Sequence, residues 1–182
     1  EPFAAAIPID CGNSATSLRL IAGQVARLST KVSLGGDRSL RSRPHVPLWD
    51  LLETLGARVE VVSGGLRIEI KGPIGPFEPA GDWLEVPADI SSQYGSSLVL
   101  ALVMVPGHHR LRLREPISSA PYLRLTLSVA RAFGLQIATS SDEGWFRIEI
   151  EGGQKPLATG DPTTPARYRI ERDWSSAAMA MV

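Results

Sequence analysis

The chain has 182 residues, with 19 basic and 19 acidic side chains and a formal net charge of zero. This length can bury a hydrophobic core in one or two domains, and the balanced charge argues against nucleic acid or a membrane surface as the main partner. The single cysteine, Cys11, excludes an internal disulfide and is typical of the reducing cytoplasm, where we expect the protein to reside.

The stretch from Asp10 to Leu20, DCGNSATSLRL, follows a short apolar strand that ends near Ile9. Its small polar residues can cap a helix that starts here, and a helix start leaves several backbone N–H groups unpaired. With Arg19 in the first turns, the stretch is a candidate receptor for phosphate or carboxylate. An ordinary capped helix explains the same residues without any ligand.

The rest of the first half predicts helices and strands in alternation. Apolar residues recur at helix spacing, charged and apolar residues alternate at strand spacing, and Gly and Pro separate the elements. In chain order we expect a helix over residues 14–28, a strand over 31–34, a basic loop over 36–44, a helix with buried Leu48, Leu51, Leu52 and Leu55 that ends at Gly56, a hairpin of strands 58–62 and 66–71, and a connector over 73–79.

The second half predicts the same order of elements. Its first helix, SSLVLALVMV, is apolar on every side and stops at a Pro-Gly pair. In chain order we expect a helix over residues 96–105, a strand over 111–114, a helix over 121–133, a hairpin of strands 135–139 and 145–151, a loop over 152–165, a strand over 167–171 and the start of a further helix.

An internal repeat explains this similarity. The segments NSATSLR, QYGSSLV and DWSSAAM align when Asn13 is matched with Gln93 and Asp173, and LRIEIKG matches FRIEIEG further along. The repeat length is about 80 residues, longer than most solenoid repeats. The chain therefore holds two full copies and the opening of a third, and it stops within an apolar segment. We expect it to be part of a longer protein.

The hydrophobic pattern predicts an inverted arrangement of layers. Strands covered on both faces read as continuous apolar runs, but RVEVV, LRIEIK and FRIEIE carry charges at alternate positions. A helix that is apolar all round has no solvent face. We therefore expect an α/β fold with the helices in the centre and the sheets outside.

Five motifs in this order resemble the enolpyruvylshikimate-phosphate synthases, which transfer the enolpyruvyl group of phosphoenolpyruvate to shikimate 3-phosphate in aromatic amino-acid biosynthesis. The motifs are DCGNSATSLRL, GGDRSLRSRP, the triplet Ser91-Ser92-Gln93, the segment Ser119-Ala120-Pro121-Tyr122 with Thr126, and DWSSA. The resemblance implies an inside-out α/β barrel built from βαβαββ units. It implies that residues 1–170 form most of one domain and that 171–182 form a hinge and the start of the next repeat or second domain.

The resemblance also implies the ligands of shikimate 3-phosphate. Hydroxyl and amide side chains at a helix start suit a phosphorylated polyol. The implied residues are Ser91, Ser92, Gln93 and Ser119, with Tyr122 beside them.

A second set of residues is implied for phosphoenolpyruvate. A guanidinium fork suits a carboxylate or phosphate group, and Arg43 resembles the arginine that binds this dianion. The set is Asn13, Ala15, Arg43 and Gln93, so Gln93 contacts both substrates. The resemblance implies neither a cofactor nor a metal. It also implies no catalytic acid or base within this chain, and the remainder of the enzyme would supply the carboxylates that transfer protons.

Other interpretations of these residues stay open. Without the resemblance, Arg43 is a solvated loop charge, the serines are a helix cap and Cys11 is a small buried residue. Many members of the family carry Gly at the position of Ala15 and Pro at that of Leu20. A sister enzyme that acts on a UDP-linked amino sugar shares the fold but carries a reactive cysteine in the loop that reads GGDRSLRSRP here. A non-catalytic anion-binding fragment is a further alternative.

Overall fold

A computed structural model describes residues 6–62, 67–77, 82–157, 160–161, 164–165 and 170. The expected strand over 167–171, the third helix start at Asp173 and the proposed hinge over 171–182 therefore lie outside the described residues, apart from residue 170.

The first copy of the repeat follows the order βαβαββ, with one additional short helix. Its elements are β1 (Ile7–Asp10), α1 (Ala15–Val25), β2 (Val32–Gly35), α2 (Arg38–Arg41), α3 (Val46–Thr54), β3 (Arg58–Val62) and β4 (Arg67–Lys71).

The second copy follows the same order without the additional helix. Its elements are β5 (Leu84–Val86), α4 (Ser92–Leu102), β6 (His108–Arg114), α5 (Ala120–Ala132), β7 (Ile137–Asp142) and β8 (Trp145–Glu151). A two-residue antiparallel pair, β9 (Gly160–Asp161) with β10 (Thr164–Pro165), follows it.

Sheet topology confirms the repeat. The first sheet has the order β1-β2-β4-β3 and the second has the order β5-β6-β8-β7. In each sheet the first two strands are parallel and the other pairs are antiparallel. The apolar faces match as well, because Leu34 pairs with Ile68 in one sheet and Leu111 pairs with Ile148 in the other. Two copies of one sequence unit therefore fold into two copies of one structural unit.

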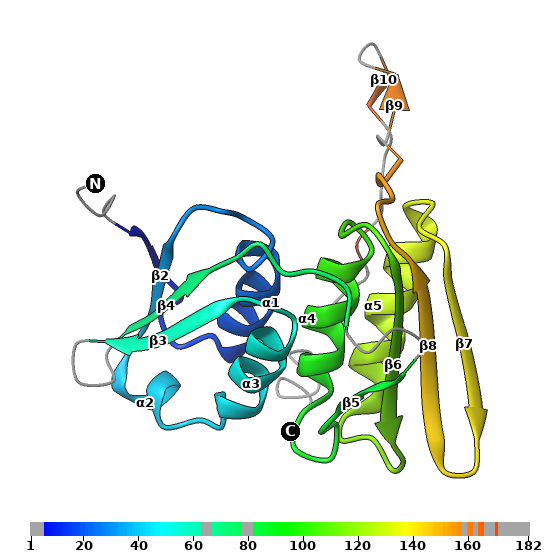
Figure 1. Cartoon of the computed structure of the whole chain (residues 1–182), viewed down its shortest axis with the longest axis horizontal. Coiled ribbons are helices and arrows are strands. Elements are labelled where there is room, and N and C mark those ends of the chain that lie inside the picture. Colours follow the sequence, from blue (N-terminus) through cyan, green and yellow to red (C-terminus); the bar gives the residue numbers. More distant parts are fainter. Residues whose placement is uncertain are drawn as a thin grey trace, which may run out of the picture.

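Helices α1 and α4 lie between the two sheets (Figure 1), an arrangement consistent with the expected central helices. Helix α1 packs against α4, and α4 packs against α5. Tyr94, Leu98 and Leu102 on α4 are at most 1% exposed. The sheets, in contrast, turn charged residues outward: Arg112 on β6 stacks on the ring of Trp145 at 4.7 Å and pairs with Glu85 at 3.1 Å.

Several of the expected boundaries are wrong, among them the end of the helix expected over 96–105, which is Leu102, and the strand expected over 135–139, which is β7 at Ile137–Asp142. Helix α1 ends at Val25 and not at residue 28. The segment after β4 binds the carbonyls that follow the helix, because the Gly72 N–H donates to the Leu28 carbonyl and the Ile74 N–H donates to the Ala26 carbonyl. Helix α4 begins at Ser92 because Ser91 caps it, with its hydroxyl accepting from the Gln93 N–H at 3.3 Å. Strand β6 begins at residue 108, since the whole segment 108–114 pairs with β8.

Two expected loops contain short elements, and β5 is a strand that the sequence did not predict. The basic loop over 36–44 holds α2, which Asp37 caps by accepting from the Leu40 N–H at 2.8 Å. The Leu40 side chain is fully buried, so tertiary packing stabilises this single turn. The expected loop over 152–165 holds the β9–β10 pair.

The two copies meet at a close helix–helix contact. A Cβ at Gly23 on α1 would lie 2.5 Å from the hydroxyl and 2.6 Å from the carbonyl oxygen of Ser97 on α4. The Ser97 hydroxyl donates a hydrogen bond of 2.6 Å to the carbonyl of Arg19. Glycine is therefore required for this approach, which brings the starts of α1 and α4 together.

Candidate functional site

The candidate site lies where the N-terminal ends of α1 and α4 meet. Ser14 caps α1 by accepting from the Ser17 N–H at 3.1 Å, and Ser91 caps α4. The two helix starts touch, because Gln93 Nε2 donates to Thr16 Oγ1 at 2.8 Å. Both helices direct unpaired backbone N–H groups toward the same region, and such groups favour an anion.

A first cluster joins Asn13 to Arg43. Arg43 Nη2 donates to Asn13 Oδ1 at 2.6 Å, and Asn13 Nδ2 donates to Asp37 Oδ2 at 2.5 Å. The N–H of Leu40 and then the Asn13 amide lower the pKa of Asp37, so this carboxylate stays charged and holds the cluster. Arg41 and Arg43 also line a cavity of about 200 Å³ whose walls are largely apolar. The structure thus brings two of the residues predicted for phosphoenolpyruvate together.

Ala15, the third residue of that set, is the first residue of α1 and is only 6% exposed. It belongs to the hydrophobic core cluster. Its backbone therefore lies at the helix start, beside the other candidate residues, while its methyl group is largely packed.

A second cluster gathers the residues predicted for shikimate 3-phosphate. Ser92 is buried and its hydroxyl donates to the Ser119 carbonyl at 3.2 Å. Ser119 has a φ of 56°, a left-handed conformation, and stands directly before α5. The Ser91 hydroxyl is 3.1 Å from Arg19 Nη1. The start of α5 therefore joins the starts of α1 and α4.

A cavity of about 390 Å³ opens beside this cluster. Gln93 and Tyr122 both line it, and Tyr122 is 60% exposed, so its ring is available to a ligand. Sequence reasoning did not assign Thr16 and Ser96 to the site, although both line this cavity. The signal for them was their place one helical turn after Asn13 and Gln93.

Arg19 has a different role from the one that the sequence indicated. Arg19 as a residue is 6% exposed, and its guanidinium donates to four acceptors of the protein itself. Burial lowers the pKa of Arg19, and the nearby Tyr94 opposes that shift. The interpretation of Arg19 as an open anion receptor is therefore wrong, since the side chain is part of the framework behind the site.

His45 is one of these acceptors. Arg19 Nε lies 3.3 Å from His45 Nδ1. Because an arginine can only donate, Nδ1 must be the acceptor, and the proton of the neutral imidazole is on Nε2. Nε2 then donates it to the Leu40 carbonyl at 2.8 Å. Burial lowers the pKa of His45, despite the opposing bond to the Leu40 carbonyl, and Arg19 and Arg43 lower it further. His45 is a neutral link within the framework.

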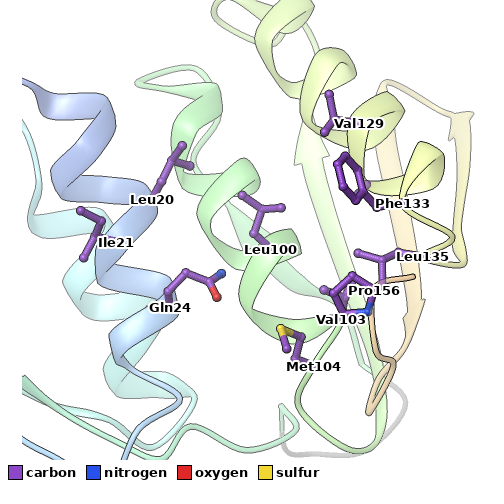
Figure 2. Close-up of a pocket in the computed structure, with 11 residues that line it drawn as sticks. Leu20, Ile21, Gln24, Leu100, Val103, Met104, Val129, Phe133, Leu135 and Pro156 are labelled. Atoms are coloured by element: carbon purple, nitrogen blue, oxygen red, sulfur yellow. The ribbon is translucent and has the colours of Figure 1, made fainter. Parts of the chain in front are cut away.

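An apolar groove between α1, α4 and α5 adjoins the cavity of about 390 Å³, since Leu20 lines both. Figure 2 shows Leu20 from α1 facing Leu100 from α4, with Val129 on α5 and Phe133 directly after α5 beyond them. The groove has a volume of about 350 Å³, and Gln24 is its one polar lining residue. No described residue outside its lining is shown to cover this apolar groove, and the lining offers no cation to an anionic substrate.

Other chemistry is limited among the described residues. Cys11 is buried, and burial followed by the charge of Asp10 raises its pKa, so its thiol is not an activated nucleophile. Within the described ranges, no three His, Cys, Asp or Glu side chains gather into a set that could hold a metal ion. No helix in this part of the chain is long and apolar enough to cross a membrane.

Comparison with known proteins gives a consistent result. The model of the family described as EPSP synthase (3-phosphoshikimate 1-carboxyvinyltransferase) matches residues 1–182. A 3-phosphoshikimate 1-carboxyvinyltransferase from Halobacterium salinarum is 35% identical over 171 residues, which cover 93% of this chain and 36% of the relative. A protein of the same name from Dehalococcoides mccartyi is 36% identical over 167 residues, covering 92% and 36%.

Solved structures agree on the fold. EPSP synthase from Acinetobacter baumannii matches with a TM-score of 0.65 and 26% identity over 85% of this chain and 32% of that chain. An enolpyruvyl transferase from Streptomyces tendae matches with a TM-score of 0.50 and 21% identity, which supports the fold alone. The chain thus spans little more than a third of the length of the curated relatives that it matches.

Proposed function

The chain belongs to the EPSP synthase family, and from this we propose that the protein transfers the enolpyruvyl group of phosphoenolpyruvate to shikimate 3-phosphate. In this reaction a hydroxyl oxygen of shikimate 3-phosphate forms a bond to the enolpyruvyl carbon, and the bond from that carbon to the phosphate oxygen breaks. The hydroxyl proton is lost and inorganic phosphate leaves. The match of the family model to the whole chain carries this proposal.

The α4–α5 side of the site would bind shikimate 3-phosphate. Ser91, Ser92, Gln93 and Ser119 gather at two helix starts, and Tyr122 lies on the wall of the adjoining cavity of about 390 Å³. Backbone N–H groups at a helix start favour a phosphate. Hydroxyls and the Gln93 amide supply both donors and acceptors for a polyol.

The α1 side would bind phosphoenolpyruvate. Arg43 keeps further N–H donors beyond the one that Asn13 accepts, and these suit a carboxylate or phosphate group. Asn13 and Ala15 would line the pocket at the start of α1. Gln93 lies between the two sides, because its amide contacts both Thr16 and Arg19. We assign no catalytic acid or base within this chain, nor a cofactor.

The proposal extends to domain organisation and location. Residues 1–170 would form most of one domain, and 171–182 the hinge to the next repeat or domain. The rest of the enzyme would supply the groups that complete the site. A cytoplasmic location is supported by the single, buried thiol.

A phosphate-release assay tests the proposal. The full-length enzyme that contains this chain is given phosphoenolpyruvate with shikimate 3-phosphate, with a UDP-linked N-acetylamino sugar, or with neither acceptor, and the 182-residue chain alone, which we expect to release no phosphate, is assayed beside it. We expect release only with shikimate 3-phosphate. Release only with the UDP-linked sugar would establish the sister activity, for which the cysteine-free loop GGDRSLRSRP, residues 35–44, gives no support. Calorimetry with shikimate 3-phosphate distinguishes the enzyme from the other alternative, a non-catalytic anion-binding module, because such a module would bind the ligand without releasing phosphate.

A further inference from the structure

Arg19 occupies a position that the second copy of the repeat fills with an apolar residue. The alignment of Asn13 with Gln93 places Arg19 opposite Val99, which is fully buried in α4. Arg19 is nearly as buried, at 6% exposure. The same helical position therefore accommodates valine in one copy, and the fold of the unit does not itself need a cation there.

A buried guanidinium is expensive unless its donors are satisfied. Arg19 meets this requirement with acceptors from both copies of the repeat. From the first copy it contacts the Pro44 carbonyl at 2.7 Å and His45 Nδ1 at 3.3 Å. From the second it contacts Ser91 Oγ at 3.1 Å and Gln93 Oε1 at 2.8 Å. One rigid, planar group thus fixes the spacing between the two copies.

On the first side, the guanidinium fixes the backbone next to Arg43. Pro44 directly follows Arg43, and its carbonyl oxygen accepts both from Arg19 Nη2 and from the Tyr94 hydroxyl, the latter at 2.6 Å. Arg19 also lies over the Tyr94 ring at 5.1 Å. Arg43 therefore extends from a backbone that two donors hold, one from each copy.

On the second side, the guanidinium fixes the orientation of the Gln93 amide. Because Oε1 accepts from Arg19, Nε2 must point to Thr16, to which it donates at 2.8 Å. An amide in this orientation keeps its second Nε2 hydrogen for another acceptor. Gln93 and Thr16 both line the cavity of about 390 Å³. The orientation thus presents a donor, and not an acceptor, to an anionic ligand.

We propose that Arg19 is a positioning residue that holds the Arg43 loop and the Gln93 amide in register, and so aligns the two substrates without contacting either. This inference rests on the proposed function. It predicts that loss of the guanidinium weakens the use of both substrates, whereas loss of Arg43 affects phosphoenolpyruvate alone.

The test compares Arg19→Met with Arg27→Met, each made in the full-length enzyme that contains this chain, in initial-rate kinetics that vary each substrate in turn. Methionine keeps much of the side-chain volume but removes all donors. Arg27, two residues after the end of α1, hydrogen-bonds with its side chain to Gln24 and Met104 among the described residues and is the matched control. We expect Arg19→Met to lower kcat/KM for both substrates on the order of 10- to 100-fold, since small misplacements of reacting groups have effects of this size. Arg27→Met should behave as the wild type.

Two further variants separate positioning from folding. Arg19→Lys keeps the charge but has no fork to span acceptors on both copies, so it should not restore the rates. Tyr94→Phe keeps the ring and removes only the second donor to the Pro44 carbonyl, so it should raise the KM for phosphoenolpyruvate and leave that for shikimate 3-phosphate unchanged. Tyr94→Phe decides the question if Arg19→Met does not fold.

The outcomes are distinguishable. If a folded Arg19→Met melts at a lower temperature but keeps both KM values and kcat well below its melting point, Arg19 only packs the interface and the inference is wrong. A Tyr94→Phe variant with unchanged KM values would also overturn it. If the wild type neither binds shikimate 3-phosphate nor releases phosphate, the proposed function itself fails, and the inference fails with it.

Discussion

Arg43 Nη2 lies 2.6 Å from Asn13 Oδ1, a hydrogen bond between residues 30 positions apart. Asn13 donates in turn to Asp37, the residue that caps α2. The loop that carries Arg43 is therefore tied to the start of α1 through side chains before any ligand binds. An arginine held in this way loses less side-chain entropy on binding than a free surface arginine.

Replacement of Arg43 by alanine should weaken phosphoenolpyruvate far more than shikimate 3-phosphate. Removing one partner of a desolvated charge pair costs about 2–5 kcal/mol, and we expect a loss in that range for the first substrate only. Steady-state kinetics that vary each substrate check this, with the exposed Arg38→Ala as the control. Equal losses for both substrates would remove Arg43 from the proposed site.

Replacement of Ala15 by glycine should increase inhibition by glyphosate. The resemblance implies that this herbicide occupies the phosphoenolpyruvate site and is slightly bulkier there. The Ala15 methyl group is packed in the core at the start of α1, so its removal would give this helix start room to shift for the larger ligand, and overpacking of such a site costs about 1–3 kcal/mol. Inhibition curves for the wild type and Ala15→Gly measure the effect, with glycine at the nearby Ala22 as a control for helix destabilisation. Superimposable curves for wild type and Ala15→Gly would contradict the prediction.

Replacement of Gly23 by alanine should destabilise the contact between the two copies. The new Cβ would meet the hydroxyl and carbonyl oxygen of Ser97 at 2.5 and 2.6 Å, so one helix must move. We expect a loss of about 1–3 kcal/mol in the free energy of unfolding, measured by urea denaturation. Gly75→Ala is the matched control, since a Cβ there has no neighbour within 4 Å. Equal stability of the two variants would show that the helices separate without cost.

Acid should weaken the framework around His45. Its pKa is lowered in the folded protein, chiefly by burial, so the unfolded chain binds the proton more readily. The stability that His45 contributes is fully present above its unfolded pKa of about 6.5 and is lost as the pH falls through the lower folded pKa. The free energy of unfolding changes there by at most about 1.4 kcal/mol per pH unit. Protonation would also turn Nδ1, which accepts from Arg19, into a donor.

Urea denaturation at several pH values between about 4 and 8 measures this effect. His45→Asn cannot titrate in this range and keeps an acceptor near Nδ1, so its stability should depend less on pH than that of the wild type. His108→Asn, at a half-exposed position, is the control. If His45→Asn and the wild type lose stability in parallel, His45 is not the titrating group.

The fold was largely predictable from the sequence because its signals are local and occur twice. Alternating charges in RIEIK and FRIEIE mark outer strands, and the all-apolar run in α4 marks a central helix. The elements that were missed lack such signals. Helix α2 is one turn stabilised by the burial of Leu40, and β5 has three residues whose partner, β6, lies more than 20 residues away. Tertiary contacts decide both.

The candidate site was predictable in part. The resemblance named the polar residues at the helix starts, and those at Ser91, Gln93, Asn13 and Arg43 do gather in two adjoining clusters. The framework behind them was not predictable, because the partners of Arg19 lie 25 to 74 positions away. An arginine next to an apolar helical stripe gives no indication of which acceptors it will reach.

The Pro44 carbonyl, shared by Arg19 and Tyr94, also limits how this chain can be recombined with its relatives. A crossover in the connector after β4 would combine a first copy from one parent with a second copy from another. Such a chimera would keep two intact sheets and yet inherit Arg19 and the pair of Ser91 and Gln93 from different ancestors. We expect hybrids to fold wherever the helix contact at Gly23 survives, and to be active only when residue 19 and its acceptors come from compatible parents.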